Sequence, residues 1–154
     1  MGYGVRVSEI VTGAHLRLVL WKAYKAVEKV DRRSIAGTGL CVSDFTILEA
    51  LLHKGPLPVN SIGKKVLLTS GSITTAVDRL AQRGLVERQP DPKDGRVAQV
   101  HLTPAGRDLI GPAFQEHAQR LEEIAGRLTS AERDTLLNLL KKYGLRAEEL
   151  AQHG

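Results

Sequence analysis

Hydroxyl-bearing and basic side chains gather between residues 70 and 83 of the chain. Ile73, Val77 and Leu80 recur there at i, i+4 and i+7, which places them on the inner face of a helix, together with Ala76. The opposite face then carries groups that hydrogen-bond to phosphates and base edges, and a glycine in the first turn lets a backbone amide approach a phosphate. The residues that we expect to contact DNA from this helix are Ser70, Gly71, Ser72, Thr74, Thr75, Arg79 and Arg83.

A second candidate contact lies in the polar loop of residues 90–96, Pro-Asp-Pro-Lys-Asp-Gly-Arg. Asp94 and Arg96 are two residues apart, so the carboxylate can hold the guanidinium in one orientation while the arginine enters a minor groove. Lys93 would add a contact to a phosphate. The alternative interpretation of this loop is an ordinary solvated turn.

The single cysteine, Cys41, stands where a helix beginning at Val42 would have its N-cap. The positive end of a helix stabilises a thiolate, which makes Cys41 a candidate redox sensor. A passive, partly buried thiol is the alternative, and the exposure of the sulfur and its neighbouring cations decide between the two.

Catalytic and metal-binding patterns are missing from the sequence. The histidines show no i, i+3 or i, i+4 pairing, one thiol is too few for a zinc site, and no common nucleotide-binding or nucleophile motif occurs. We therefore expect no catalytic residue, no metal, no cofactor and no enzyme activity. A lone cysteine excludes a disulfide-rich secreted scaffold, and without a long apolar run we expect a cytoplasmic protein with no membrane partner.

Hydrophobic periodicity divides the chain into helices and one pair of strands. We expect helices over residues 11–35, 42–52, 59–66, 70–83 and 104–128, and a last helix opened by a capping box at residues 129–132. The third and fourth are separated by three residues, as in a helix-turn-helix. Residues 85–89 and 97–103 form a predicted hairpin around the polar loop. The predicted fold is mainly α with a small β-hairpin wing, a winged helix-turn-helix with long N- and C-terminal helices.

The two terminal arms need a partner for their apolar stripes. The chain has 154 residues, and a winged helix needs only about 60 to 80. We expect a single domain, residues 1–154, in which residues 42–103 bind DNA and residues 11–36 and 104–154 pair with a second copy of the chain. Such a homodimer presents two recognition helices to major-groove segments roughly 34 Å apart. The alternative is that the arms fold back on their own lobe.

Charge and aromatic content point to two further partners. A net charge of +5 and an isoelectric point near 9.6 favour a polyanion, and the helix-turn-helix specifies double-stranded DNA. Aromatic residues are scarce, at one Trp, three Tyr and two Phe, and several fall on the first, second and fifth predicted helices. There they predict a pocket for a small aromatic ligand, although core packing is their more common use. The expected lining is Trp21, Tyr24, Phe45, His53, Phe114 and His117.

Short segments spread over most of the chain form a specific combination. They are Phe45–Leu52, Leu67–Thr74, Val77–Leu80, Gly84–Val86, Asp91–Arg96 and Leu102–Gly106. In this order they resemble the MarR family of winged-helix transcriptional regulators. The resemblance implies an obligate homodimer joined by the first and last helices, a recognition helix at residues 70–83 and a wing at residues 90–96. It also implies a repressor of a pseudo-palindromic operator, released by a small phenolic or aromatic ligand bound between the dimerisation helices and the DNA-binding lobe.

Two positions depart from the family pattern. The wing of the family commonly carries Asp-Arg-Arg, whereas Gly95 takes the middle place here, which removes one phosphate contact. Peroxide-sensing members carry a reactive cysteine in the first helix, where this chain has none, which argues against organic-peroxide sensing. Residues 66–75 are most similar to the branch that answers quinones and related phenols.

Two alternatives to a ligand-responsive repressor stay open. One is a thiol-based regulator that senses oxidants through Cys41. The other is a winged helix that binds another protein instead of DNA, and the positive charge of Arg79, Arg83 and Arg96 argues against it.

Overall fold

A computed structural model describes residues 10–67 and 69–153 of the chain, except the side chain of Ser70. These residues form two compact units, one ending at Ala113 and the other beginning at Phe114. The first holds α1 (Gly13–Ile35), the short 3-10 helix η1 (Ala36–Thr38), α2 (Val42–Lys54), β1 (Leu57–Pro58), α3 (Val59–Val66), α4 (Ser70–Gln82), β2 (Val86–Pro90) and β3 (Ala98–Leu102). Helix α5 (Pro104–Ala125) crosses the boundary, and α6 (Ser130–Gln152) belongs to the second unit. The predicted helices and the predicted hairpin are confirmed.

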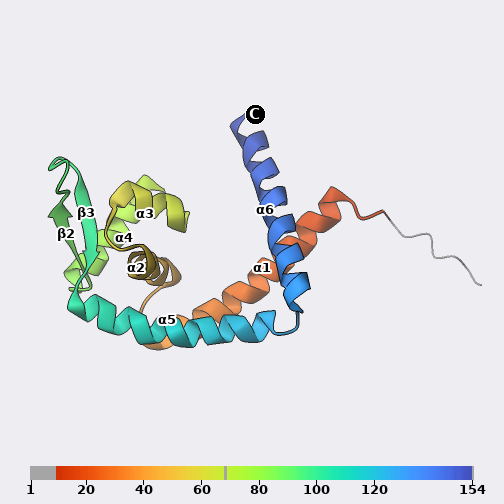
Figure 1. Ribbon diagram of the computed structural model, residues 1–154, viewed down its shortest axis with the longest axis horizontal. Helices are drawn as coiled ribbons and strands as arrows, with labels where there is room; N and C mark the ends of the chain where they lie inside the picture. The colour runs from red at the N-terminus through yellow and green to blue at the C-terminus, as the bar shows by residue number, and fades with distance from the viewer. Residues whose placement is uncertain (1–9, 68, 154) are drawn as a thin grey trace, which may run out of the picture. The chain divides into compact units, whose positions relative to one another are not determined.

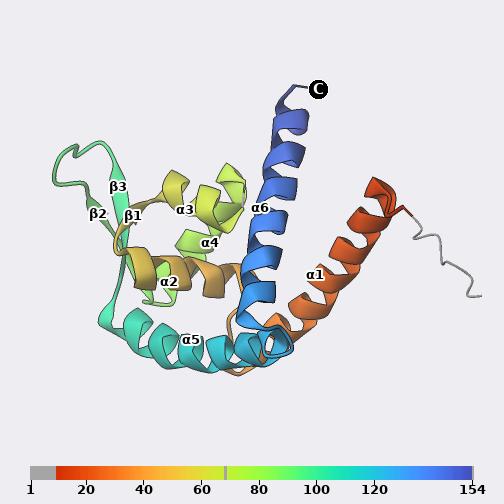
Figure 2. The ribbon, with the colours of Figure 1, turned by 45° about the vertical axis from the view of Figure 1, so that its right-hand side comes forward.

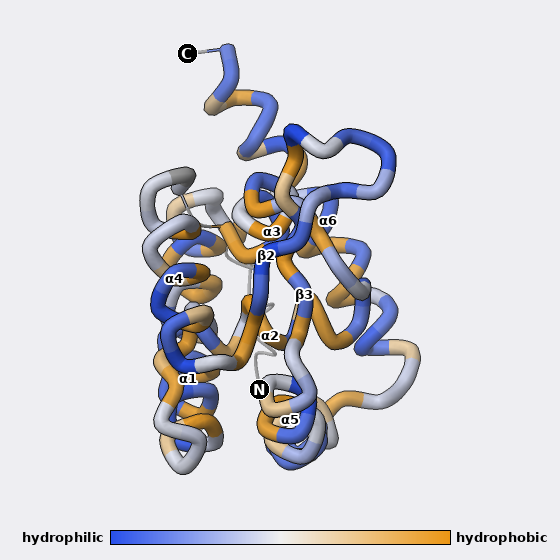
Figure 3. Tube along the Cα trace, turned by 90° about the vertical axis from the view of Figure 1, so that its left-hand side faces the viewer, coloured by the Kyte–Doolittle hydropathy of each residue, from blue (hydrophilic) through white to orange (hydrophobic). Residues whose placement is uncertain are grey.

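The core of the first unit lies among α2, α3, α4 and the strands. Ile47 and Leu48 of α2, Ile62 of α3, Leu80 of α4 and Val100 of β3 are all completely buried. Figure 1 shows the three helices packed together beside the hairpin, and Figure 2 shows the loop between β2 and β3 reaching beyond them. That loop is among the most hydrophilic parts of the trace in Figure 3, as its Asp, Lys and Arg content requires. The apolar core therefore carries a polar loop between β2 and β3.

The sheet has three strands, one more than the sequence predicts. All pairs are antiparallel in the order β1-β3-β2, with Leu57 opposite Val100 and Val86 opposite Leu102. Strand β1 has only two residues, and one is Pro58, so it carries no alternating pattern that sequence analysis can detect. Its pairing with β3 places β3 in the centre of the sheet, between β1 and β2.

Helix α1 meets the rest of its unit near its C-terminal end. It begins two residues later than predicted, with Thr12 as the N-cap whose Oγ1 accepts a hydrogen bond from the His15 amide at 3.2 Å. Gly39, in the left-handed conformation at φ +68°, turns the chain towards α2. Most of α1 extends away from the three-helix core in Figures 1 and 2. Large apolar side chains are therefore exposed along it: Leu16, Leu18, Val19, Leu20, Trp21 and Tyr24.

The second unit holds the C-terminal part of α5 and the whole of α6. Helix α5 ends at Ala125, three residues before its predicted end, and the predicted capping box opens α6. Thr129 Oγ1 accepts from the Glu132 amide, and the Glu132 carboxylate accepts from the Thr129 amide at 2.8 Å, which lowers the pKa of Glu132. No described residue of α6 is buried. The apolar side chains exposed along α6 are Leu136, Leu137, Leu139, Leu140, Tyr143, Leu145 and Leu150.

No single helix of the described residues is long and apolar enough to cross a membrane. Helices α1–η1 and α2 reach that length and composition only together, with a bend of 80° between them. Within the same residues, no group of three or more His, Cys, Asp or Glu side chains comes together as a metal site.

The start of α5 lies unusually close to the connection between α4 and β2. A Cβ atom on Gly106 would lie 2.0 Å from the Leu85 carbonyl oxygen. Thr103 fixes this approach, because its Oγ1 accepts from the Gly106 amide at 3.0 Å and donates to the Gly84 carbonyl at 2.6 Å, while its own amide donates to the Leu85 carbonyl. Only glycine fits between two backbones at this distance.

Replacing Gly106 by alanine is expected to lower the free energy of unfolding by about 1 to 3 kcal/mol, because the rigid Leu85 carbonyl must be displaced. Gly71→Ala is the matched control, since a Cβ there meets nothing within 4 Å. We expect it to change stability by less than about 0.5 kcal/mol or to raise it slightly. Urea denaturation of both variants measures the difference. Equal stabilities would show that α5 can move away from the Leu85 carbonyl without loss of stability.

Candidate nucleic-acid interface

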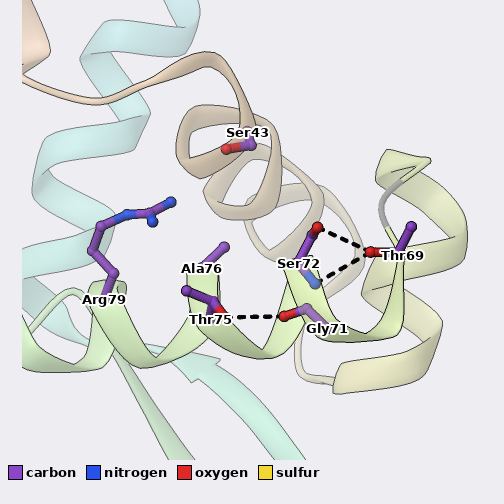
Figure 4. Close-up of a pocket in the computed structure, with 7 residues that line it drawn as sticks. All are labelled: Ser43, Thr69, Gly71, Ser72, Thr75, Ala76 and Arg79. Carbon is purple, nitrogen blue, oxygen red and sulfur yellow. Dashed lines mark hydrogen bonds between the residues drawn. The ribbon is translucent and has the colours of Figure 1, made fainter.

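Helices α3 and α4 are joined by the tight turn of a helix-turn-helix. Leu67 takes the left-handed conformation at φ 57°, and its amide donates to the Gly63 carbonyl, which ends α3. Leu68, the next residue, lies outside the described residues. Thr69 caps α4, because its Oγ1 accepts from the Ser72 amide at 3.3 Å and donates to Ser72 Oγ at 2.9 Å (Figure 4). The sequence prediction placed Thr69 in the link without this role.

Helix α4 presents one buried and one polar face, as predicted. Ile73, Val77 and Leu80 are at most 1% exposed, and Ala76 is buried beside them. On the other face Gly71, Ser72, Thr74 and Thr75 are exposed, while only the backbone of Ser70 is described. The Thr75 hydroxyl donates to the Gly71 carbonyl at 3.0 Å, which orients its side chain along the helix (Figure 4). We call these exposed residues, 71, 72, 74 and 75, the α4 polar face.

Arg79 does not extend freely from α4. Its Nε donates to Asp44 Oδ2 at 2.8 Å, and its Nη2 donates to Asp44 Oδ1. Asp44 lies in the first turn of α2 and is 2% exposed, whereas the Arg79 side chain is 45% exposed. The hydrogen bonds that Arg79 donates to the Asp44 carboxylate raise the pKa of Arg79 above its already high value. The Arg79 guanidinium, which the sequence predicts to contact DNA, is thus paired with the Asp44 carboxylate on α2.

Two further arginines tie α4 to its neighbours. Arg83 Nη1 donates to the Gly39 carbonyl at 3.1 Å, in the turn between η1 and α2. Arg88 of β2 forms an ion pair with Asp78 of α4 at 2.7 Å. Sequence analysis missed Arg88, because neither partner belongs to a local motif and their proximity comes from the packing of β2 on α4.

The wing loop has an internal scaffold built around Asp91. Its Oδ1 accepts from the amides of Lys93 and Asp94 at 2.7 and 3.2 Å, and Oδ2 accepts from the Gln99 side chain. Asp94 in turn accepts from the Arg96 amide at 3.1 Å and lies 3.5 Å from Arg96 Nε. The Arg96 side chain is 95% exposed. The Asp94 carboxylate therefore lies beside the Arg96 guanidinium, as their two-residue spacing predicts, and solvent surrounds the rest of the arginine side chain.

The order of the wing is expected to depend on the charge of Asp91. Amides of Lys93 and Asp94 hold the pKa of this carboxyl below its ordinary value of 3.8. Because the folded pKa is depressed, the contribution of Asp91 is complete above the ordinary value and is lost as the pH falls through the lowered one. The amide chemical shifts of Lys93 and Asp94 should follow that titration. Asp91→Ala should abolish it and speed amide exchange in the loop at neutral pH, whereas Asp108→Ala, an exposed control on α5, should leave both unchanged.

An open pocket of about 600 Å³ lies between the N-terminal halves of α2 and α4. Hydroxyl groups from both helices line it, with Ser43 on α2 across from Ser72 and Thr75 on α4, and Arg79 lies at one end (Figure 4). The complete lining is Ser43, Thr69, Gly71, Ser72, Thr75, Ala76 and Arg79. Three residues of the α4 polar face, Gly71, Ser72 and Thr75, therefore line this open surface together with Arg79.

The comparisons with known proteins agree on one family. Residues 40–98 match the model of the MarR family. The HTH-type transcriptional regulator MhqR of Bacillus subtilis is 37% identical over 134 residues, which cover 87% of this chain and 92% of that protein. The chain belongs to the MarR family. Its similar relatives are named as transcriptional regulators and not as enzymes.

Solved structures share the fold of this chain. A mutant MarR from E. coli, complexed with operator DNA, has a TM-score of 0.74 at 26% identity and covers 83% of this chain and 92% of its own. BpsR of Bordetella bronchiseptica, whose structure concerns regulation of DNA binding by 6-hydroxynicotinic acid, has a TM-score of 0.73 at 28% identity over 86% and 93%. The winged helix-turn-helix prediction is confirmed.

The six residues predicted to line an effector pocket have different environments in this MarR-family chain. Trp21 and Tyr24 are more than half exposed on α1, and His53 is exposed near the end of α2. Phe45 is 2% exposed and belongs to the core, the more common use of such a residue. In the second unit, Phe114 is half-buried and His117 is buried. None of the six lines the pocket between α2 and α4.

Cys41 occupies the N-cap position of α2, as predicted, and is exposed. Its sulfur makes no capping hydrogen bond but lies 3.1 Å from Ser43 Oγ and 3.7 Å from Arg79 Nη2. The exposure and the neighbouring cation are two conditions for a reactive thiol that sequence analysis left undecided. Redox sensing by Cys41 stays a hypothesis.

Proposed function

We propose that this MarR-family protein is a homodimeric DNA-binding repressor that leaves a pseudo-palindromic operator when a small phenolic or aromatic ligand binds. The α4 polar face is the observation that carries the proposal. Small hydroxyl side chains, together with an unobstructed Gly71, lie opposite a fully buried apolar stripe on the second helix of a helix-turn-helix. This arrangement lets a helix enter a major groove closely. The complex of MarR from E. coli with operator DNA supports the same role here.

The wing supplies the second set of proposed contacts. Lys93 and Arg96 lie on a hydrophilic loop held by Asp91, beyond the three-helix core (Figure 2). Asp94 restrains Arg96 at 3.5 Å, so the guanidinium loses less freedom on entering a narrow minor groove. The net charge of +5 also supports binding to a polyanion such as DNA.

Binding to DNA is tested by fluorescence anisotropy with the duplex upstream of the protein's own gene. We expect the logarithm of the association constant to fall linearly with the logarithm of salt concentration. Thr74→Glu, which adds a negative charge to the α4 polar face, should abolish specific binding. Gln115→Glu, an exposed position on α5, is the matched control and should bind like the wild type. Equal affinity of the two variants would remove α4 from the interface.

The homodimer is proposed from the exposed apolar residues of α1 and α6. Monomeric proteins rarely expose so many large apolar side chains along their helices. A second copy related by a two-fold axis is the most common partner that buries such a surface. Light scattering at micromolar concentration should give about twice the chain mass of 16.8 kDa. A mass of one chain at that concentration would contradict the proposal.

The ligand response is proposed from the aromatic residues of α1. Trp21 is the only tryptophan and is 54% exposed, so its fluorescence reports binding beside it or beside Tyr24. Regulation of BpsR by 6-hydroxynicotinic acid, a hydroxylated aromatic acid, supports an effector of this class. Salicylate or a hydroquinone should change Trp21 fluorescence and release DNA over the same concentration range. Cys41→Ser should respond like the wild type, whereas release by oxidant that depends on Cys41 would favour the thiol mechanism.

A further inference from the structure

Both arginines of α4 end on the same short segment of the first unit, residues 39–44. Arg79 and Arg83 are four residues apart and lie on one face of the helix. Arg79 grips Asp44 through two nitrogens, and Arg83 donates to the Gly39 carbonyl. The partners lie 35 and 44 residues earlier in the chain. The C-terminal half of α4 is therefore held at two points to the turn that leads into α2.

The tie at Asp44 is strong because the carboxylate is buried. Asp44 is 2% exposed, and a buried carboxylate without a partner is strongly unfavourable. A guanidinium that donates from both Nε and Nη2 matches the two oxygens in position and in angle. Among the described residues no buried side-chain nitrogen or oxygen lacks a hydrogen-bond partner. Moving Arg79 onto a phosphate would therefore leave the buried Asp44 carboxylate without its counter-ion.

The segment that the arginines hold is itself well defined. Gly39 is fixed in the left-handed conformation, and Cys41 is the N-cap of α2. A clamp between this segment and α4 sets the angle between the two helices. The α4 polar face lies on the N-terminal half of the same helix, so a change in that angle moves residues 71–75 relative to DNA.

We propose that Asp44 is a positioning residue for DNA recognition. Together with the Gly39 carbonyl it holds the recognition helix through Arg79 and Arg83, and these arginines act by fixing α4 and not by neutralising phosphates. The proposal rests on the proposed DNA binding and reassigns two residues that sequence analysis expected to contact DNA.

Asp44→Asn in the full-length protein separates the two roles. The variant keeps both arginines and gains positive charge, so phosphate contacts from Arg79 would leave affinity unchanged or higher. A positioning role predicts about tenfold weaker operator binding, the loss of one charge-assisted hydrogen bond, with an unchanged salt slope. Circular dichroism confirms that the variant is folded before affinity is compared.

Arg83→Ala decides the question if Asp44→Asn does not fold, because Arg83 makes its bond to Gly39 at the surface. A positioning role predicts weaker binding with the salt slope of the wild type. Lys93→Ala, a proposed phosphate contact in the wing, is the control and should lower the slope by about 0.9.

The outcomes distinguish the inference from the function on which it depends. Full affinity of Asp44→Asn, or a slope for Arg83→Ala that falls as far as that for Lys93→Ala, overturns the positioning role and leaves DNA binding intact. A wild-type protein that binds no DNA overturns both.

Discussion

An Arg96→Ala variant is expected to bind a specific operator about 5- to 150-fold more weakly than the wild type, corresponding to roughly 1 to 3 kcal/mol for one well-placed arginine contact. The guanidinium is almost fully exposed, the Arg96 amide donates a hydrogen bond to Asp94, and Nε lies 3.5 Å from the same carboxylate. We therefore expect Arg96 to lose little further freedom on binding DNA. Anisotropy titrations should show the largest loss on operators with A·T-rich flanks, where the narrow minor groove concentrates negative potential.

Two comparisons make the wing prediction specific. Arg120→Ala removes an equally charged residue from α5, where it pairs with Glu123 three residues away, and should change affinity by less than twofold. Asp94→Ala should fall between the two, because Arg96 keeps its charge but loses its restraint. If Arg96→Ala retains wild-type affinity at low and high salt, the wing is not part of the interface.

The second large effect is on stability. Arg79→Leu should lower the free energy of unfolding by about 2 to 3 kcal/mol, because it leaves the Asp44 carboxylate buried without its counter-ion. Loss of one partner from a fully buried pair costs about 3 to 5 kcal/mol, and the smaller figure applies because the Arg79 side chain is nearly half exposed and water reaches the vacated position.

A double variant tests the origin of that loss. Adding Asp44→Leu to Arg79→Leu removes the unpaired charge and should recover most of the stability, since apolar replacement of both partners is often neutral. Urea denaturation of the two single variants and the double variant gives the coupling energy. Additive losses in the double variant would mean that the pair is not the cause.

Local patterns in the sequence were sufficient for most of the architecture. The period of 3.6 residues placed Ile73, Val77 and Leu80 on a buried face, and the Thr129 capping box marked the start of α6 to the residue. These features depend on residues within one or two turns of each other. The same holds for Asp94 and Arg96, whose two-residue spacing was enough to predict their contact.

What the sequence did not reveal depends on distant partners. Helical periodicity correctly excluded Arg79 from the core, yet its guanidinium direction is set by Asp44 on another helix. Strand β1 exists only because β3 lies beside it, since two residues including Pro58 have no preference of their own. Phe45 shows the limit of composition: an aromatic residue predicts an apolar environment and does not distinguish a core from a pocket.

Thr103 has a consequence for the DNA that this protein selects. It bonds to the Gly84 carbonyl at the end of the recognition helix and to the amide that opens α5, and it follows directly after the last strand of the wing. Arg88 and Asp78 add a second cross-link between wing and helix. These contacts join α4 and the wing within one unit, so we expect the distance between them to change little on binding DNA. Inserting one base pair inside a half-site would move the two proposed targets apart by about 3.4 Å and out of phase, so we expect it to weaken operator binding.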